Sequence, residues 1–216
     1  MPIFEFCGER AALIVIDMQN AFLQEAYPSY VPDARQAVEG INALARICRG
    51  QQIPVIWTTH ALKSDLSNRG LIPQAIARSL MEDGPGIELY SEMEVSSVDK
   101  VIRKTRFSAF WKTDLYDFLR VQGRDQLIIV GCVLNVCCET TARDAFQHDI
   151  QVFLPKELNK TRDHEDVGFG QYLAEEITAS ILTSLGNKFV HLIATDELMG
   201  ELSLTRSSRG SHENIS

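Results

Sequence analysis

The stretch from Gly131 to Phe146 places a cysteine where nucleophilic chemistry is possible. It follows residues 126–130, a short β-branched apolar run that predicts a strand buried on both faces, and it continues into a segment of helical composition. Cys137 therefore falls at a predicted strand-to-helix turn, where unpaired backbone N–H groups and the helix dipole favour thiolate over thiol. The alternative interpretation is that Cys137 and Cys138 are small buried apolar residues, because free cysteine is among the most buried residue types. This stretch alone leaves both interpretations open.

Two further residues with reactive side chains stand at the ends of predicted strands. Asp17 follows the apolar run 11–16, and Lys104 ends the run 99–104. If these strands neighbour the strand before Cys137, the three side chains point into one crevice, because parallel sheets bind ligands at the carboxyl ends of their strands. A lysine cation would favour the thiolate, and a carboxylate can carry protons to and from the sulfur and the leaving group. Each residue alone is an ordinary cap or solvated residue, but together they predict a catalytic site.

Apolar runs alternate with helical segments along the chain, and this alternation must position these residues. The predicted strands are 11–16, 53–58, 99–104, 126–130, 150–154 and 188–194. Helices are predicted from about Asp33, after Thr113 or Asp114, after Cys137, from Val167 to Leu185 and, briefly, from Asp196, with a long, partly helical excursion over residues 61–96. The alternation predicts an α/β fold in which helices cover both faces of a mainly parallel sheet, a three-layer αβα sandwich.

Length and composition fit one globular domain. The chain has 216 residues, 45% of them hydrophobic and 23% charged, which is enough for one sizeable core. The net charge of −8 argues against binding to nucleic acid or to an anionic membrane. Five cysteines, an odd number, and the absence of a signal-peptide pattern predict a reduced, cytoplasmic protein. We expect one domain over residues 1–202 and a disordered tail over residues 203–216, which are rich in Ser, Arg and Gly.

Four stretches resemble the isochorismatase-like cysteine hydrolase superfamily, in its amidohydrolase branch. They are Leu13–Asn20, Ile53–Thr58, Lys104–Phe110 and Gly131–Phe146. The resemblance implies a six-stranded, Rossmann-like parallel sheet between helices, and a catalytic triad of Asp17, Lys104 and Cys137. The family places its nucleophile six residues after the glycine, which selects Cys137 rather than Cys138.

The same resemblance implies hydrolysis of a C–N bond in a small amide, ureido or carbamoyl substrate, without a cofactor. Cys137 would attack the carbonyl, Asp17 would move the proton, and backbone N–H groups near Val133 and Cys137 would stabilise the oxyanion. A cis peptide bond between Cys132 and Val133 is also implied, as is a homo-oligomer, either a dimer or a tetramer. Two alternatives stay open: an isochorismatase, which cleaves a vinyl ether by acid catalysis, and a non-catalytic interaction module of the same fold.

Five residues near the strand ends are candidates for substrate binding: Gln19, Phe22, His60, Phe110 and Trp111. Aromatic residues in such places are also common packing residues, and His60 is alternatively an ordinary polar loop residue. The chain departs from the metal-binding nicotinamidases, which resemble it but carry Asp-x-His after the second strand and another histidine beyond. Because Thr58-Thr59-His60 offers one histidine and no carboxylate, and a catalytic zinc needs about three protein ligands, we expect no catalytic metal.

Overall fold

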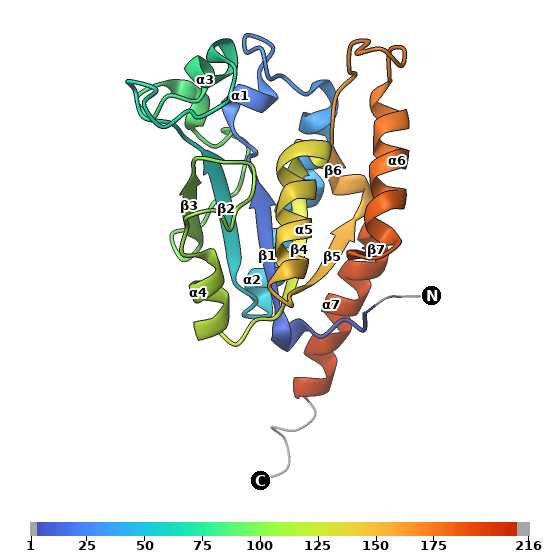
Figure 1. The fold of residues 1–216 in the computed structure, drawn as a ribbon. Coiled ribbons are helices and arrows are strands. Elements are labelled where there is room, and N and C mark those ends of the chain that lie inside the picture. The colour runs from blue at the N-terminus through green and yellow to red at the C-terminus, as the bar shows by residue number, and fades with distance from the viewer. Residues whose placement is uncertain (1–3, 211–216) are drawn as a thin grey trace.

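The computed structural model describes residues 4–210 and shows a parallel sheet between two layers of helices (Figure 1). The strands of its main path are β1 (Ala11–Ile16), β2 (Val55–His60), β3 (Lys100–Lys104), β4 (Gln126–Cys132), β5 (Gln151–Pro155) and β7 (Val190–Ile193). They lie in the order β3-β2-β1-β4-β5-β7, and neighbouring strands pair in parallel. The two-residue β6 (Asn159–Lys160) pairs with the end of β4. The predicted α/β sandwich is confirmed.

The helices form the two outer layers. They are α1 (Asn20–Leu23), α2 (Val38–Gly50), α3 (Gln74–Ser79), α4 (Leu115–Val121), α5 (Glu139–Gln147), α6 (Ala174–Gly186) and α7 (Thr195–Gly210). Alternate residues of β1 point to opposite faces, so that Leu13 packs into a core with α2 and α7, and Ile14 packs into a core with α4, α5 and α6. Because both faces are covered, β1 and β4 are buried along their whole length, which explains their unbroken apolar runs.

The build-up of the sheet reverses between β1 and β4, and the reactive residues lie at this point. From β1 the chain adds β2 and β3 toward one edge, whereas β4, β5 and β7 extend toward the other. Such a switch point opens a crevice at the carboxyl ends of the strands. Gly131 allows the two central strands to end this close together, because it has a φ of 123° and a Cβ there would lie 2.2 Å from the Ile16 carbonyl oxygen. Asp17 then leaves the sheet with a φ of 49°.

Residues 61–96 form the partly helical excursion that the sequence predicts. They contain α3 and a 3₁₀ turn at Pro85–Ile87, so the expected turn around Gly84-Pro85-Gly86 is present. The Arg106 guanidinium, just beyond β3, donates a 2.8 Å hydrogen bond from Nη1 to the Asn68 carbonyl oxygen. This contact holds the excursion against the carboxyl end of the sheet, beside α1 (Figure 1).

Helix α6 begins at Ala174, later than the start at Val167 that the sequence predicts, and residues 161–173 form a loop. Gly168 and Gly170 both have positive φ angles in this loop. Their backbone N–H groups donate to the same Asp166 carboxylate oxygen, at 2.6 and 2.9 Å. The resulting turn is incompatible with a helix, which corrects the predicted boundary.

Two other boundaries also differ from the sequence-based expectation. Strand β2 pairs with β3 as far as His60, so His60 ends a strand and does not stand in a loop. Helix α7 continues to Gly210, into the stretch predicted as a tail from residue 203, and residues 211–216 of that tail lie outside the described residues. Within residues 4–210, no helix has the length and apolar character that a membrane crossing requires.

Candidate active site

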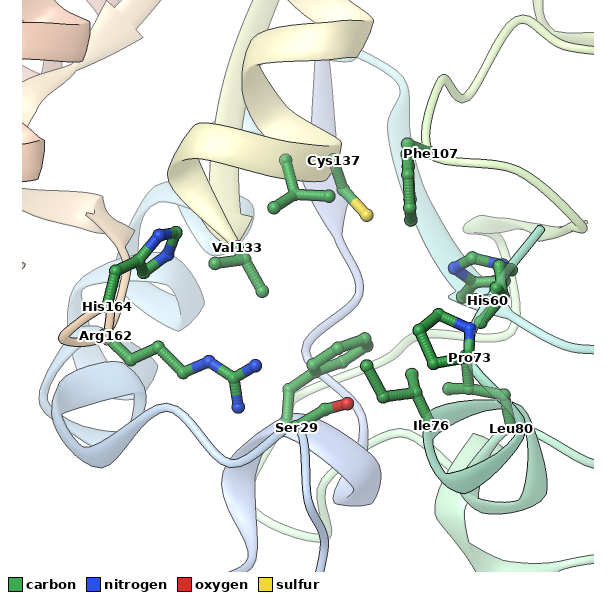
Figure 2. A pocket seen from close by; sticks show the side chains of 13 residues that line it. Ser29, His60, Pro73, Ile76, Leu80, Phe107, Val133, Cys137, Arg162 and His164 are labelled. Carbon is green, nitrogen blue, oxygen red and sulfur yellow. The ribbon is translucent and has the colours of Figure 1, made fainter. Parts of the chain in front are cut away.

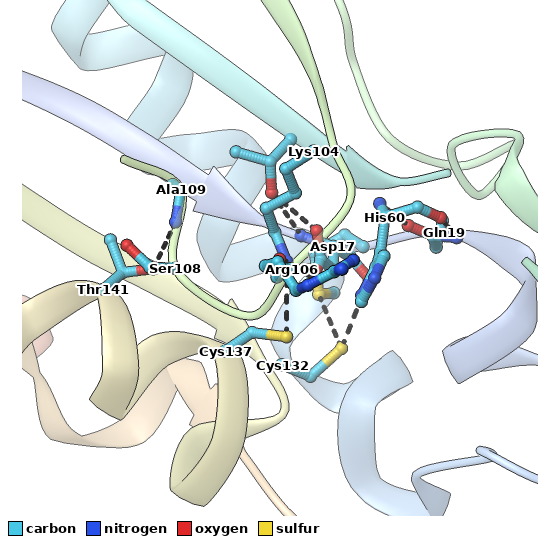
Figure 3. A network of polar contacts seen from close by, with 12 residues as sticks. Asp17, Gln19, His60, Lys104, Arg106, Ser108, Ala109, Cys132, Cys137 and Thr141 are labelled. Atoms are coloured by element: carbon cyan, nitrogen blue, oxygen red, sulfur yellow. Dashed lines mark hydrogen bonds and ion pairs between the residues drawn. The ribbon is translucent and has the colours of Figure 1, made fainter. Parts of the chain in front are cut away.

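Asp17, Lys104 and Cys137 meet at the switch point of the sheet, as Figure 3 shows. The Lys104 ammonium lies 2.7 Å from Asp17 Oδ2, 3.4 Å from Cys137 Sγ and 3.1 Å from the Arg106 carbonyl oxygen. These three acceptors match the three N–H donors of an ammonium group. All three members of the cluster are buried, with exposed fractions of 2% or less.

Each member of this cluster is delivered by the end of a different strand. Asp17 directly follows β1, Lys104 is the last residue of β3, and Cys137 lies in a short π-helical turn between β4 and α5. The peptide bond between Cys132 and Val133, at the start of that turn, is cis. The three elements are separate in the sequence, and the parallel sheet brings their ends to one edge.

Two contacts tie the segment after Lys104 to the helix after Cys137. Ser108 Oγ donates a 2.5 Å hydrogen bond to Asp144 Oδ2. Thr141 Oγ1 accepts a 3.1 Å bond from the Ala109 backbone N–H, which Figure 3 shows. Because Asp144 and Thr141 both belong to α5, these bonds limit movement of the lysine relative to the cysteine.

Thr58 is a member of the site that sequence reasoning missed. Its hydroxyl donates a 2.6 Å hydrogen bond to Asp17 Oδ1 and accepts a 3.2 Å bond from the Asp17 backbone N–H. Thr58 lies on β2 two residues before His60, so the two side chains share one face of the strand. That alternation was a usable signal, since both side chains point toward the cluster.

Burial and the two neighbouring charges act in opposite directions on the ionisation of Cys137. Burial raises the pKa of the Cys137 thiol to about 12, with the Lys104 cation acting to lower the pKa and the Asp17 carboxylate acting to raise it. Burial alone would lower the pKa of Lys104, but Asp17 and Cys137 outweigh it and raise that pKa, so Lys104 stays charged. Desolvation thus opposes the helix-dipole and cation effects, which on their own favour the thiolate.

A pocket of about 190 Å³ lies next to Cys137 (Figure 2). Its apolar wall consists of Phe22, Ile72, Pro73, Ile76, Leu80, Phe107, Val133 and Val136. Four of these residues come from the excursion 61–96, which therefore shapes one side of the pocket. Polar side chains are few, and they are Ser29, His60, Arg162 and His164. A small cavity with apolar walls and a few converging polar groups is typical of a small-molecule site.

A model of the isochorismatase domain matches residues 11–184 of this chain. The chain belongs to the isochorismatase family. It is similar to nicotinamidase 3 of Arabidopsis thaliana, with 31% identity over 195 residues that cover 89% of this chain and 88% of that protein. A solved cysteine hydrolase from Pseudomonas syringae matches with a TM-score of 0.89 and 30% identity, over 94% of this chain and 96% of that one.

Similarity to the isochorismatase of Bacillus subtilis is more partial. The identity is 34% over 145 residues, which cover 67% of this chain and 46% of that protein. This chain thus matches about half the length of that relative. Together the matches identify an isochorismatase-family hydrolase, whose substrate and mechanism are taken up below.

Gln19 hydrogen-bonds to the backbone beside this isochorismatase-family site and does not line the pocket. Its Oε1 accepts a 2.7 Å hydrogen bond from the His60 backbone N–H, and its Nε2 donates to the carbonyl oxygens of His60 and Gly86 at 3.2 and 3.0 Å. The side chain is fully buried, and its amide is engaged on both sides. The predicted substrate-binding residue Gln19 is thus fully hydrogen-bonded by the backbone around it and lies outside the pocket lining.

His60, a predicted substrate-binding residue, lines the pocket. Burial lowers its pKa to about 3, and the Lys104 charge acts in the same direction, while Asp17 and a hydrogen bond to the Thr105 backbone oppose them. The imidazole is therefore neutral near pH 7. Its Nε2 is buried without a hydrogen-bond partner among the described residues, which leaves it available to a ligand.

The three aromatic residues predicted to bind substrate lie in different environments. Phe22 lines the pocket, but Phe110 is buried in the core beside α5, with its ring centroid 5.2 Å from that of His148. Trp111 is half exposed and stacks under Lys112. Phe107 lines the pocket in their place, because the chain after Lys104 turns this residue inward. The aromatic cluster was visible in the sequence, but the choice among its members was not.

Asp17, His60 and Cys137 form a set of side chains that metal ions commonly use. One ligand atom from each lies within 4.8 Å of the others. Their types would suit zinc, and sequence reasoning counted His60 alone. However, the Lys104 ammonium already contacts Asp17 and Cys137, and a second cation beside it would be strongly repelled in a buried site. The residues as arranged do not fit the divalent cation of the metal-binding nicotinamidases.

Proposed function

We propose that this chain hydrolyses the C–N bond of a small amide, ureido or carbamoyl substrate, with Cys137 as the nucleophile. The observation that carries the proposal is the contact of Cys137 Sγ with the ion pair of Lys104 and Asp17, beside a pocket. An amide is resonance-stabilised and its amine leaves poorly, so its cleavage benefits from a covalent acyl-enzyme step. Similarity to a cysteine hydrolase and to a nicotinamidase supports the same chemistry.

In the proposed mechanism the sulfur attacks as its proton leaves. Because the pKa of the Cys137 thiol is about 12, a pre-formed thiolate is scarce near pH 7, and the Asp17 carboxylate accepts the proton during attack. Lys104 stabilises the negative charge that develops on the sulfur, and backbone N–H groups of Val133 and Cys137 stabilise the oxyanion. Asp17 then gives the proton to the leaving amine, which leaves a thioester. Water hydrolyses the thioester to the acid and restores the thiol.

Hydrolysis of a vinyl ether, as in an isochorismatase, is the second candidate. It is favoured by the similarity to the isochorismatase of Bacillus subtilis. That reaction needs a proton donor and no nucleophilic sulfur, so Asp17 would carry it and Cys137 would be dispensable. A non-catalytic interaction module would need neither a pocket nor a buried ion pair beneath it, and burying two charges costs free energy.

A substrate panel tests the proposal. The purified protein is incubated with primary amides, N-carbamoyl amino acids, ureido acids and isochorismate, and amine, ammonia and acid products are measured. We expect C–N hydrolysis, a loss of at least about a thousandfold in Cys137→Ala, and most of the activity in Cys138→Ala. Cys138 is the matched control, because it is buried in the core beside α5. Equal losses in the two folded variants would contradict the assignment of the nucleophile.

A further inference from the structure

The imidazole of His60 leaves one ring nitrogen unused at the wall of the pocket. Its Nε2 is buried without a hydrogen-bond partner among the described residues, and the residue is only 1% exposed. His60 nevertheless lines the pocket, so a bound molecule can reach it. Buried polar atoms in folded proteins are nearly always hydrogen-bonded, because water no longer supplies a partner. A ligand in the pocket can supply the partner that Nε2 lacks.

This nitrogen is a hydrogen-bond acceptor. Because Nε2 has no partner, the hydrogen bond between the imidazole and the Thr105 backbone involves the other ring nitrogen, Nδ1. That bond acts to raise the pKa of His60, as a carbonyl oxygen does when a ring N–H donates to it, which assigns the ring proton to Nδ1. The imidazole is neutral near pH 7, so Nε2 carries a lone pair. Its missing partner is therefore an N–H or O–H donor.

The imidazole is held in place before any ligand binds. Gln19 accepts a hydrogen bond from the His60 backbone N–H and donates one to the His60 carbonyl oxygen, at 2.7 and 3.2 Å. The ring of Phe107 packs edge-on against the imidazole, with 6.0 Å between the ring centroids. An acceptor that is fixed in this way discriminates sharply between ligands that carry a donor and ligands that lack one.

The unused acceptor lies beside the groups that would carry the reaction. One side-chain atom from each of Asp17, His60 and Cys137 lies within 4.8 Å of the others. In Figure 2 the Cys137 sulfur points toward the side of the pocket where His60 lies. Val133, whose backbone N–H is a proposed oxyanion donor, lies on the opposite side of the sulfur. A substrate that directs its carbonyl oxygen toward Val133 therefore places its scissile nitrogen toward Asp17 and His60.

We propose that Nε2 of His60 accepts a hydrogen bond from an N–H on the scissile nitrogen, so that the substrate must carry such an N–H. The inference rests on the proposed C–N hydrolysis and specifies its substrate class. Primary and monosubstituted amides and ureas satisfy the acceptor. Amides with two substituents on the nitrogen, and esters, leave it buried and unpaired, and the site rejects them.

His60 exchanges no proton in this reaction. The thiol proton of Cys137 moves to Asp17 as the S–C bond forms, and it moves on to the nitrogen as the C–N bond breaks. The N–H that is bonded to His60 leaves with the amine. Held through this N–H, the nitrogen can turn the lone pair that it gains on attack toward Asp17.

Ligand binding to an inactive protein tests this inference. In a Cys137→Ala background, calorimetric titration compares the primary amides, N-methyl amides and methyl esters of acetic, isobutyric and benzoic acid. An N-methyl amide and a methyl ester match in size and charge but differ by one N–H. For at least one of the three acids, we expect an amide to bind at least about tenfold more tightly than the ester, as one buried hydrogen bond predicts.

Substitutions of His60 in the same background show whether its imidazole is the acceptor. His60→Leu should abolish the preference for amide over ester. His60→Gln should keep part of it, because the glutamine side-chain oxygen can accept a hydrogen bond. His148→Leu is the matched control, since this histidine stacks on Tyr116 and does not line the pocket, and the preference should remain.

The outcomes separate this inference from the proposed reaction. Equal binding of amides and esters, no binding of any amide, or a preference that survives in folded His60→Leu would overturn the role of His60. If His60→Leu does not fold, the comparison of amide with ester in the Cys137→Ala protein and in His60→Gln still decides. A preference for amides in a protein whose parent hydrolyses no C–N bond would leave the inference standing and overturn the proposed reaction alone. Hydrolysis of amides without that preference would overturn the inference alone.

Discussion

The Thr58 hydroxyl donates a 2.6 Å hydrogen bond to Asp17 Oδ1, while the Lys104 ammonium lies 2.7 Å from the other oxygen of the same carboxylate. Both oxygens are therefore held before any substrate arrives. Thr58 is fully buried, so water cannot replace its hydrogen bond. The orientation of the Asp17 carboxylate, the proposed proton acceptor, therefore depends on Thr58.

Thr58→Val tests whether the orientation of the Asp17 carboxylate matters for activity, because it removes the hydrogen bond and keeps the carboxylate. Valine keeps the shape but leaves a buried carboxylate oxygen without its donor, so we expect the free energy of unfolding to fall by about 1–3 kcal/mol. On the best substrate kcat should fall by roughly 10–100-fold with little change in KM, because a small misplacement of a catalytic group slows the chemical step. Thr58→Ser retains the hydroxyl and should restore most of kcat. An unchanged kcat in Thr58→Val would exclude the positioning role.

The charges around Cys137 predict an unusual result for Asp17→Asn. Asp17 raises the pKa of the Cys137 thiol and Lys104 lowers it, so removing the carboxylate should lower that pKa even as hydrolysis stops. We expect Asp17→Asn to be alkylated at Cys137 by iodoacetamide at least about tenfold faster at pH 7.5, which corresponds to a fall of roughly one pKa unit. Lys104→Met should slow the same labelling. Peptide mass spectrometry measures both rates.

Cys48 is the internal control for this labelling experiment. Burial raises its pKa to about 12 as well, but the neighbouring charge acting on it is that of Arg49 and not that of Asp17. Its labelling should therefore not change in Asp17→Asn. Slower labelling of Cys137 in that variant would contradict the charge balance described for the site.

The buried imidazole of His60 should make the fold sensitive to mild acid. Its pKa is about 3 in the folded protein, against 6.5 for a histidine in water, so below pH 6.5 the unfolded chain takes up a proton that the folded chain does not. Stability should therefore fall as the pH falls from about 6.5 toward 3, by up to about 1.4 kcal/mol per pH unit from this residue. Urea unfolding at pH 7, 6, 5 and 4 measures the slope. In His60→Gln the slope of stability against pH should be smaller, by the amount that uptake of one proton on unfolding contributes. An identical slope in both proteins would refute the prediction.

Gly131 should tolerate no side chain. A Cβ there would lie 2.2 Å from the Ile16 carbonyl oxygen, and the φ of 123° is unfavourable for any other residue. We expect Gly131→Ala to lower the free energy of unfolding by at least about 2 kcal/mol. Gly50→Ala is the matched control at the end of α2, where nothing lies within 4 Å of an added Cβ. It should be neutral or stabilise by up to about 1 kcal/mol, and equal effects would show that contact with β1 is not the cause.

Much of this site was predictable because its reactive residues stand where apolar runs stop. Asp17 and Lys104 end such runs, and Cys137 follows one closely, so local pattern and the geometry of parallel sheets suffice to bring them together. The raised pKa of the Cys137 thiol was not predictable in the same way. It arises from burial, which is a property of the folded chain and not of the local sequence.

The parts that could not be predicted lie in irregular segments. Phe107 rather than Phe110 faces the pocket because of how the chain turns after β3, and no periodicity specifies that turn. Arg162 lines the pocket from the loop that residues 161–173 form. The sequence predicted a helix from Val167 and gave no sign of how this loop runs. These irregular segments form part of the pocket wall, so the sequence predicted the cluster at the strand ends better than the lining of the pocket.

The role of the sulfur itself distinguishes the two candidate reactions. Vinyl-ether cleavage needs a proton, which Asp17 can supply, whereas amide cleavage at this site would need the Cys137 sulfur as nucleophile. Asp17→Asn should therefore be inactive on either substrate, and Cys137→Ser should be informative. On an amide it should lose at least about a thousandfold, equivalent to roughly 4 kcal/mol in the barrier, while on isochorismate it should change little. The 3.4 Å contact between Lys104 and Cys137 favours the amide outcome, because a sulfur that only fills space needs no adjacent cation. Near-full activity of Cys137→Ser on the best substrate found would exclude C–N hydrolysis through the sulfur and leave acid-catalysed ether cleavage as the function.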